Sequence, residues 1–260
     1  LSLSGAVLQG YFQNPMAGPF VVGVSSGASF GAVLALFLGL NMSVFGFSVQ
    51  SIFAFGSGLA IVSLVYLLSQ KKGLFKVETL LLTGIAAGAM ASSLTSFLIF
   101  LRSESFEQAV FWLLGSFRLA EWSHIRVIFP QFILCFFICC WLAKDMNLLV
   151  MGDETAQSLG CPVKRTRKIF LFLSTLLASS SVSVSGIIGF VGLIVPHWVR
   201  LLIGPDHRHL FLFSSLLGGV FLMFCDLLAR TALPGSELPI GIITAVIGAP
   251  FFIYLLTQRK

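Results

Sequence analysis

The sequence predicts an all-α, polytopic helical membrane protein, and three observations support this prediction. Hydrophobic residues make up 57% of the 260 residues, charged residues only 10%, and the mean hydropathy is +0.99. A soluble domain usually carries about 25% charged residues, so lipid must cover much of this exterior. The apolar runs do not alternate and are far longer than the ~10-residue strands of a membrane barrel. At roughly 20 residues per span, the chain holds about eight or nine helices.

The helices can be placed along the chain from its apolar runs and its turn residues. A partial helix over 1–12 is followed by a turn-rich loop at 13–19. The first twelve residues are too short to span and have no charged leader, so we interpret the N-terminus as truncated. Nothing divides the chain, which predicts a single transmembrane domain over 1–260. The predicted spans are 24–42, 48–70, 77–101, 125–143, 168–186, 188–203, 211–232 and 239–257.

The basic residues orient these spans. If the chain changes side at every span, one side receives 12 of the 16 Lys and Arg residues. The positive-inside rule makes that side cytoplasmic, together with the C-terminus and the 144–168 loop, in a cytoplasmic (inner) membrane. Short basic clusters between spans also argue against nucleic-acid binding. The cytoplasmic set is Lys71, Lys72, Lys76, Lys144, Lys164, Arg165, Arg167, Lys168, Arg200, Arg208, Arg259 and Lys260; the outer set is Arg102, Arg118, Arg126 and Arg230.

Two connections are long enough to have structure of their own. The outer one, 102–124, contains aromatic residues of the kind that favour a membrane interface. The inner one, 144–168, predicts a short helix with Asp153 and Glu154 in its first turn and with Gly160 and Pro162 as its stop. This helix is too polar for lipid and too short to be stable alone. It must therefore rest on its own bundle or on a partner protein.

Small residues recur every fourth position on span 77–101, at Gly84, Gly88, Ser92 and Ser96. This spacing places them on one helix face, where another helix can approach closely. Ordinary helix packing explains such a face. The alternative is a smooth, weakly polar face that lines a pathway for a large solute.

The segment 181–200 predicts a broken or kinked helix. Gly186, Gly189 and Gly192 are spaced by three, and Pro196 leaves the carbonyl near Gly192 without its helical donor. His197 follows at the cytoplasmic end of this segment. A packed interfacial histidine is the simpler interpretation of His197, and a ligand or proton relay is the alternative.

Asp226 and Arg230 lie four residues apart near the outer end of their span, so they are placed to pair. Such a pair lowers the cost of inserting both charges. The alternative is an arginine held at the outer surface for an acidic partner.

Other functional classes lack the motifs that they need. The sequence has no P-loop, HExxH or GxSxG motif and no paired membrane carboxylates, so we expect no enzyme, no nucleotide site and no bound cofactor or metal. The cysteines predict neither a disulfide framework nor a zinc site. A transporter or channel that acts without an ATPase remains the rival class, with a membrane enzyme third.

Five stretches of the sequence follow one another along the chain as recognisable motifs: SGAVLQGYFQNPMAGPFVVGVSSGASFGA, LLGSF, MNLLVMGDETAQSLGCPVKRTRK, SGIIGFVGLIVPHWVRLLIGPDHR and ELPIGIITAVIGAPFFIYLL. They resemble the FecCD/BtuC-type permeases, the membrane subunits of type II ABC importers for iron–siderophore complexes, haem, cobalamin and, in some members, molybdate. The similarity runs from Leu1 to Lys260.

The resemblance implies a ten-span permease, of which this chain would lack the first span and part of the second. It implies a homodimer or pseudo-dimer with the translocation path between the subunits. Two ATPase subunits, which bind ATP and Mg, would lie below it and one substrate-binding protein above. Iron chelates are the commonest cargo of the family, so an iron–siderophore complex is the expected cargo here, with cobalamin, haem and oxyanions such as molybdate as alternatives.

The resemblance also implies roles for particular residues. Arg230 would dock the binding protein, and the face on span 77–101 would line the path. The family's inner gate lies near Val77 and Glu78, where members vary. The ATPase-coupling loop, with coupling helices near 152–162, would comprise Gly152, Asp153, Glu154, Ala156, Leu159 and Gly160.

Overall fold

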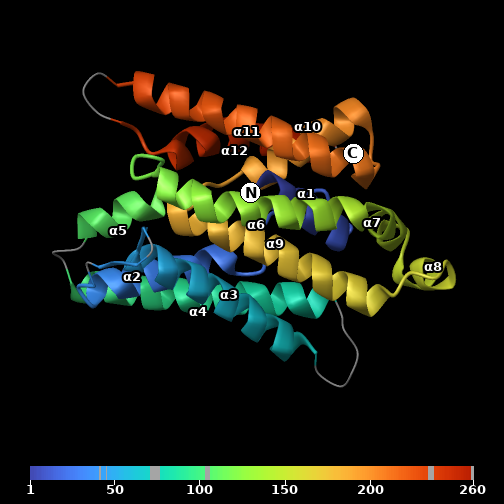
Figure 1. Ribbon diagram of the computed structural model, residues 1–260, viewed down its shortest axis with the longest axis horizontal. Helices are drawn as coiled ribbons and strands as arrows, with labels where there is room; N and C mark the ends of the chain where they lie inside the picture. Colours follow the sequence, from blue (N-terminus) through green and yellow to red (C-terminus); the bar gives the residue numbers. More distant parts are fainter. Residues whose placement is uncertain (41, 45, 71–76, 103–105, 234–236, 259–260) are drawn as a thin grey trace. The chain divides into compact units, whose positions relative to one another are not determined.

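Helices make up most of the computed structural model of the protein (Figure 1), which describes residues 1–40, 42–44, 46–70, 77–102, 106–233 and 237–258. Lys71, Lys72, Lys76, Arg259 and Lys260, part of the predicted cytoplasmic set, lie outside these residues. The described helices are α1 (Ser2–Tyr11), α2 (Val24–Phe37), α3 (Val49–Ser69), α4 (Val77–Leu101), α5 (Phe106–Leu113), α6 (Trp122–Trp141), α7 (Ala143–Val150), α8 (Asp153–Ser158), α9 (Val163–Ser185), α10 (Val191–Ile203), α11 (His207–Thr231) and α12 (Ile240–Gln258).

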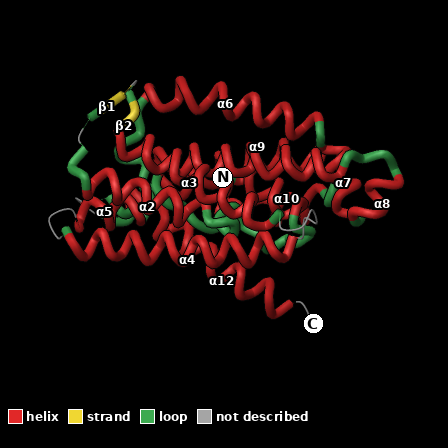
Figure 2. Tube along the Cα trace, turned by 90° about the horizontal axis from the view of Figure 1, so that it is seen from below, coloured by secondary structure: helices red, strands yellow, loops and turns green. Residues whose placement is uncertain are grey.

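The predicted all-α class is confirmed, and each predicted helix has a counterpart. Span 77–101 corresponds to α4, which ends at the predicted Leu101, and the short helix of the inner loop is α8. Two elements were not predicted. One is α7, which continues the chain after α6; the other is a hairpin of β1 (Ser43–Val44) and β2 (Phe47–Ser48), shown in Figure 2.

Five of the described helices are long and apolar enough to cross a membrane, namely α3, α4, α6, α9 and α11. The other three predicted spans correspond to shorter apolar helices, α2, α10 and α12 over 240–255. At 1.5 Å per residue, the 14 residues of α2 extend about 21 Å, less than the ~30 Å of a hydrocarbon core. Not every apolar helix therefore crosses the bilayer by itself.

The chain folds as two compact units. Unit 1 comprises Leu1–Pro19, Pro130–Leu177 and Gly189–Lys260; unit 2 comprises Phe20–Phe129 and Ala178–Ile188. The expectation of one transmembrane domain stays a prediction.

In unit 1, helix α1 packs closely on α10 and α11 because small residues occupy the contacts. A Cβ added to Gly5 would lie 1.9 Å from the carbonyl oxygen of Gly192, and one added to Gly218 would lie 2.5 Å from Cβ of Ser2. Without these glycines the backbones would have to separate. Small residues allow this close approach where lipid provides no hydrophobic drive for helix association.

The break predicted between 181 and 200 lies at residues 186–190, and Pro196 lies inside α10. The chain leaves α9 at Gly186 (φ +67°) and enters α10 after Phe190 (φ +65°). The carbonyl of Gly192, which Pro196 leaves without a helical donor, accepts a hydrogen bond from Nε2 of the buried Gln9 at 3.3 Å. Oε1 of Gln9 accepts from Nη2 of Arg200 at 3.0 Å.

His197 packs edge-on against the ring of Phe251, with 6.0 Å between ring centroids. This contact agrees with the simpler interpretation of His197, that of a packed histidine.

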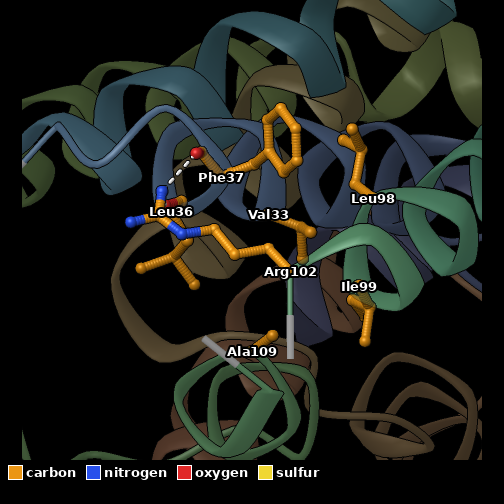
Figure 3. Close-up of a pocket in the computed structure, with 7 residues that line it drawn as sticks. All are labelled: Val33, Leu36, Phe37, Leu98, Ile99, Arg102 and Ala109. Carbon is orange, nitrogen blue, oxygen red and sulfur yellow. Dashed lines mark hydrogen bonds between the residues drawn. The ribbon is translucent and has the colours of Figure 1, made fainter. Parts of the chain in front are cut away.

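In unit 2, helices α2, α3 and α4 lie together. A Cβ on Gly31 of α2 would lie 2.2 Å from the carbonyl oxygen of Phe53 in α3, so these two helices also meet through glycine. Arg102, after α4, donates Nη1 hydrogen bonds to the carbonyls of Leu36 and Phe37 at the end of α2 (Figure 3). This arginine closes a helix C-terminus, where cations are favourable. The small apolar pocket beside it contains none of the predicted pathway residues.

Candidate functional site

Helix α8 presents two different faces. Gly152, at φ +108°, begins it in a backbone conformation that favours glycine, and Gly160, at φ +85°, follows its end. Ala156 is fully buried, whereas Glu154 is exposed and Leu159 is 59% exposed. The helix therefore rests on its own chain through Ala156, while an acidic side chain on the helix and an apolar one just after it stay accessible.

Helix α7, just before α8, is held at two points. Gln13, after α1, donates from Nε2 to the carbonyl of Leu149 at 2.7 Å. Asn147 donates to Oδ1 of Asp206 at 2.7 Å, and its own Oδ1 accepts from the backbone N–H of His207 at 3.0 Å. The Arg208 backbone N–H, together with Asn147, lowers the pKa of Asp206 by stabilising its carboxylate. Helix α7 is thus fastened to the end of α1 and the start of α11.

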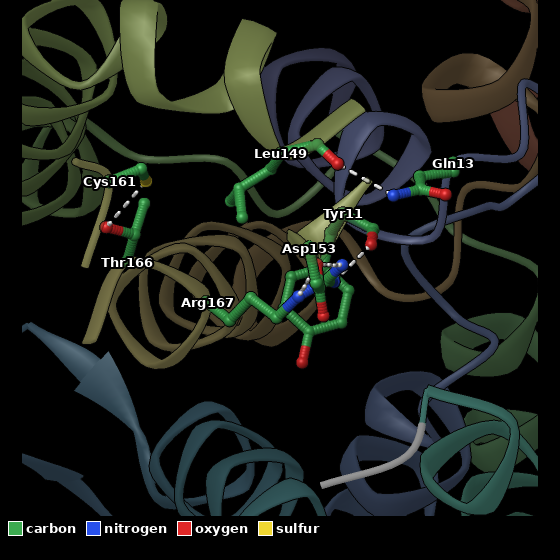
Figure 4. A network of polar contacts seen from close by, with 7 residues as sticks. All are labelled: Tyr11, Gln13, Leu149, Asp153, Cys161, Thr166 and Arg167. Carbon is green, nitrogen blue, oxygen red and sulfur yellow. Dashed lines mark hydrogen bonds and ion pairs between the residues drawn. The ribbon is translucent and has the colours of Figure 1, made fainter. Parts of the chain in front are cut away.

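Helix α8 is held by one buried arginine (Figure 4). Arg167 of α9 donates from Nε and Nη2 to Oδ1 of Asp153, at 3.1 and 2.6 Å, and from Nη1 to the carbonyl of Tyr11 at 2.7 Å. After α8, Cys161 is buried and its Sγ lies 3.8 Å from Oγ1 of Thr166. Asp153, predicted to face the ATPase, is thus also bound within its own chain.

The sequence analysis missed two exposed apolar residues beside α8. Val150 is 42% exposed and Met151 is 64% exposed, close in sequence to Gly152. With Leu159 they give the loop an apolar surface. In the sequence, the signal for this surface was the hydrophobic pair Val150 and Met151 at the edge of a polar loop.

The predicted face of α4 is divided in two. Gly84 and Gly88 are buried against the segment that leads into α2: a Cβ on Gly84 would lie 2.9 Å from the carbonyl oxygen of Val21. Ser92 and Ser96 are exposed, and Oγ of Ser92 donates to Oγ of Ser26 at 3.2 Å. The glycines therefore pack against the chain, while the serines are accessible.

The weak gate candidates begin α4. Val77 is half-buried and Glu78 is exposed. Their role stays a prediction.

Arg230 pairs with two acids. Its Nε lies 2.9 Å from Oδ2 of Asp226, as the spacing predicted, and its Nη1 lies 3.9 Å from Oε1 of Glu237. The Arg230 side chain is 48% exposed. Among the described residues, no three His, Cys, Asp or Glu side chains gather as a metal site.

Long apolar helices, glycine-mediated contacts and a polar helix on a short loop define an integral membrane protein of helical bundles. The chain belongs to the FecCD transport family, whose sequence profile matches residues 1–258. It is a permease subunit of an ABC importer, hence a transport component.

Relatives and a solved structure agree with this assignment. The chain is 44% identical over its full length to the cobalamin import system permease protein BtuC of Halobacterium salinarum, covering 69% of that protein. It is 37% identical to the Fe(3+) dicitrate transport system permease protein FecD of Escherichia coli, covering 80% of it. A solved structure of an ABC transporter assigned to the metal-chelate type, in an inward-facing conformation, matches with a TM-score of 0.90 and 38% identity. The match covers 99% of this chain and 81% of that one.

Proposed function

We propose that this permease imports a metal chelate across a cytoplasmic membrane, with iron–siderophore complexes as the first candidate cargo. The whole-length structural match to a transporter assigned to the metal-chelate type carries this proposal. The relatives are named for several cargoes, and the 44% identical cobalamin permease favours cobalamin, itself a metal complex, as the second candidate. Haem and molybdate follow from more distant relatives.

In this proposal the permease works as a homodimer or pseudo-dimer with two ATPase subunits and a substrate-binding protein. Helices α7 and α8, between α6 and α9, face the cytoplasm, and so does the C-terminus. ATP binding closes the ATPases and moves α8, which shifts the spans between outward and inward access. The exposed Glu154 of α8 supports this role, together with the exposed Val150, Met151 and Leu159 on either side of the helix, because several exposed apolar residues in one place are typical of a protein contact.

The cargo can be tested by reconstituting the permease in liposomes with its ATPase and its binding protein. We expect ATP-dependent uptake of a radiolabelled ferric siderophore. Cobalamin, haem and molybdate are measured in parallel under the same conditions. Uptake of molybdate alone would contradict the metal-chelate proposal, and uptake without ATP would favour the rival class of secondary transporter.

The second prediction concerns the accessible part of the α4 face. Ser92→Leu adds bulk where we place the translocation path, and we expect transport to fall about tenfold, the effect of ~1.4 kcal/mol. Ser93→Leu is the matched control, because Ser93 is also exposed but points about 100° away around the helix. Normal uptake by the Ser92 variant would remove this face from the path. Gly84 is unsuitable for the test because its substitution would disturb packing.

The third prediction concerns docking of the binding protein at Arg230. Glu237 already lies 3.9 Å from the guanidinium, so an incoming carboxylate must compete with it. Glu237→Gln should strengthen docking about two- to fivefold at low salt, since an exposed pair contributes at most ~1 kcal/mol. Arg230→Glu should weaken docking at least ~10-fold through like-charge repulsion.

Surface charges are screened over ~8 Å at physiological ionic strength, so both effects should shrink as salt is added. The affinity is measured by surface plasmon resonance on the permease in nanodiscs. Arg208→Glu, an exposed charge at the start of α11, is the control. Affinities that equal the wild-type value for both variants would remove Arg230 from the docking site.

A further inference from the structure

Arg167 is an unusual arginine because it is buried where a charge needs strong compensation. Its side chain is only 6% exposed, whereas Lys164, Arg165 and Lys168 on the same helix are exposed. Removing a charge from water is costly unless partners replace the water. The partners of Arg167 therefore show what the chain gains from burying it.

Those partners come from two elements, α8 and α1. Asp153 begins α8 and neutralises the guanidinium with one carboxylate oxygen, while half of its own side chain stays exposed. The carbonyl of Tyr11 ends α1, where a helix leaves carbonyls without an intrahelical donor. The ring of Tyr11 also lies under the guanidinium, with 5.1 Å from Cζ to the ring centroid. One planar group on α9 thus joins the start of α8 to the end of α1, as Figure 4 shows.

The two short helices differ in how they are held. Two sets of side-chain hydrogen bonds fasten α7, through Gln13 and through Asn147. Within the part of the chain that the structure describes, the Asp153–Arg167 pair is the single ion pair between α8 and another element. A six-residue helix is not stable alone in water, so the position of α8 depends strongly on this pair and on the buried Ala156.

We propose that Arg167 is a positioning residue that fastens α8 to the end of α1, so that a displacement of α8 is passed to α1 through its guanidinium. The first half of this inference concerns the permease by itself. The second half rests on the proposed coupling role of α8. In this arrangement Asp153 binds Arg167 within the chain, while Glu154 and Leu159 contact the ATPase.

Hydrogen exchange of the complete permease in nanodiscs tests the fastening without any ATPase. In Arg167→Gln, the hydrogen-bonded backbone amides of 156–160 should exchange at least ~10-fold faster, because α8 loses charge-assisted hydrogen bonds. Amides of α1, α7 and α10 should stay protected. Asp153→Asn should give a similar change, and the double variant should add little, since both changes break one pair. Arg165→Gln, an exposed neighbour with the same charge change, is the control.

Coupling is then measured in the reconstituted importer as substrate transported per ATP hydrolysed. We expect Arg167→Gln to lower this ratio at least ~5-fold, about 1 kcal/mol in the linkage, while the ATPases still bind. Arg167→Lys should restore only part of it, because an ammonium lacks the fork that reaches Asp153 and Tyr11 together.

The outcomes separate the two halves of the inference. Unchanged exchange of α8 in Arg167→Gln would overturn the fastening role. Faster exchange throughout unit 1 would also overturn it, since Arg167 would then support the fold at large. Faster exchange confined to α8 with a normal transport ratio supports the fastening, and it shows that the proposed coupling role of α8 is what fails.

Discussion

Gly5→Ala should lower the free energy of unfolding of this permease by ~3 kcal/mol or more, because overpacking a close contact typically costs ~1–3 kcal/mol and this contact is among the tightest in the chain. The added Cβ would lie 1.9 Å from the carbonyl oxygen and 2.5 Å from Cα of Gly192, and these are backbone atoms that cannot rotate away. Helix α1 would have to leave α10, and Gln9 would then lose its hydrogen bonds to the carbonyls of Gly192, which Pro196 leaves without a helical donor, and of Leu193. A loss of ~3 kcal/mol corresponds to a melting temperature lower by about 6–12 °C.

The same substitution at Gly56 is the matched control. Gly56 also lies inside an apolar helix, α3, but nothing lies within 4 Å of the Cβ that it would gain. We expect Gly56→Ala to melt within ~2 °C of the wild type, since a change well away from such contacts stays near ±0.5 kcal/mol. Thermal unfolding of both variants in detergent measures the difference. Equal melting temperatures would mean that α1 and α10 are not in the close contact described here.

The helices were predictable from the sequence because lipid imposes a strong local rule. A backbone in hydrocarbon must satisfy its own hydrogen bonds, so apolar runs become helices whatever they touch. The apolar run that ends at Leu101 was predicted as α4 from this rule. Helix α7 did not, because its sequence, AKDMNLLV, is neither apolar enough for a span nor separated from α6 by a turn residue.

The candidate site was predictable in position and less so in orientation. Gly152, Gly160 and the acidic first turn located α8, and the family resemblance assigned its role. Nothing in the spacing of Asp153 and Arg167 indicated their pair, which depends on how α9 returns beside α1. Likewise, period-four spacing placed Gly84 and Ser92 on one face of α4 but could not show that only Ser92 is accessible.

Replacing Glu154 and Leu159 together with alanine should uncouple the ATPase while the permease stays folded. Glu154 is exposed on α8 and Leu159 is exposed just after it, whereas the residue of α8 that is buried is Ala156. If they form the centre of the contact with the ATPase, their truncation should cost about 2 kcal/mol, which is ~30-fold in affinity. Stimulation of ATP hydrolysis by the loaded binding protein should fall with it, and transport should be lost at working concentrations of the ATPase.

Gln157→Ala is the control for this double variant. Gln157 is exposed too, but it follows Asp153 by one turn, on the side of α8 that leads toward Arg167. Co-purification of the ATPase with the permease, and its hydrolysis rate with and without the binding protein, measure both parts of the effect. Wild-type stimulation and transport in the double variant would place the contact with the ATPase elsewhere, with the exposed Val150 and Met151 as the next surface to test.

Because the double variant leaves the Asp153–Arg167 pair intact, its α8 amides should exchange as slowly as in the wild type. Loss of coupling at an unchanged exchange rate would therefore assign the defect to the outer face of α8 rather than to its attachment.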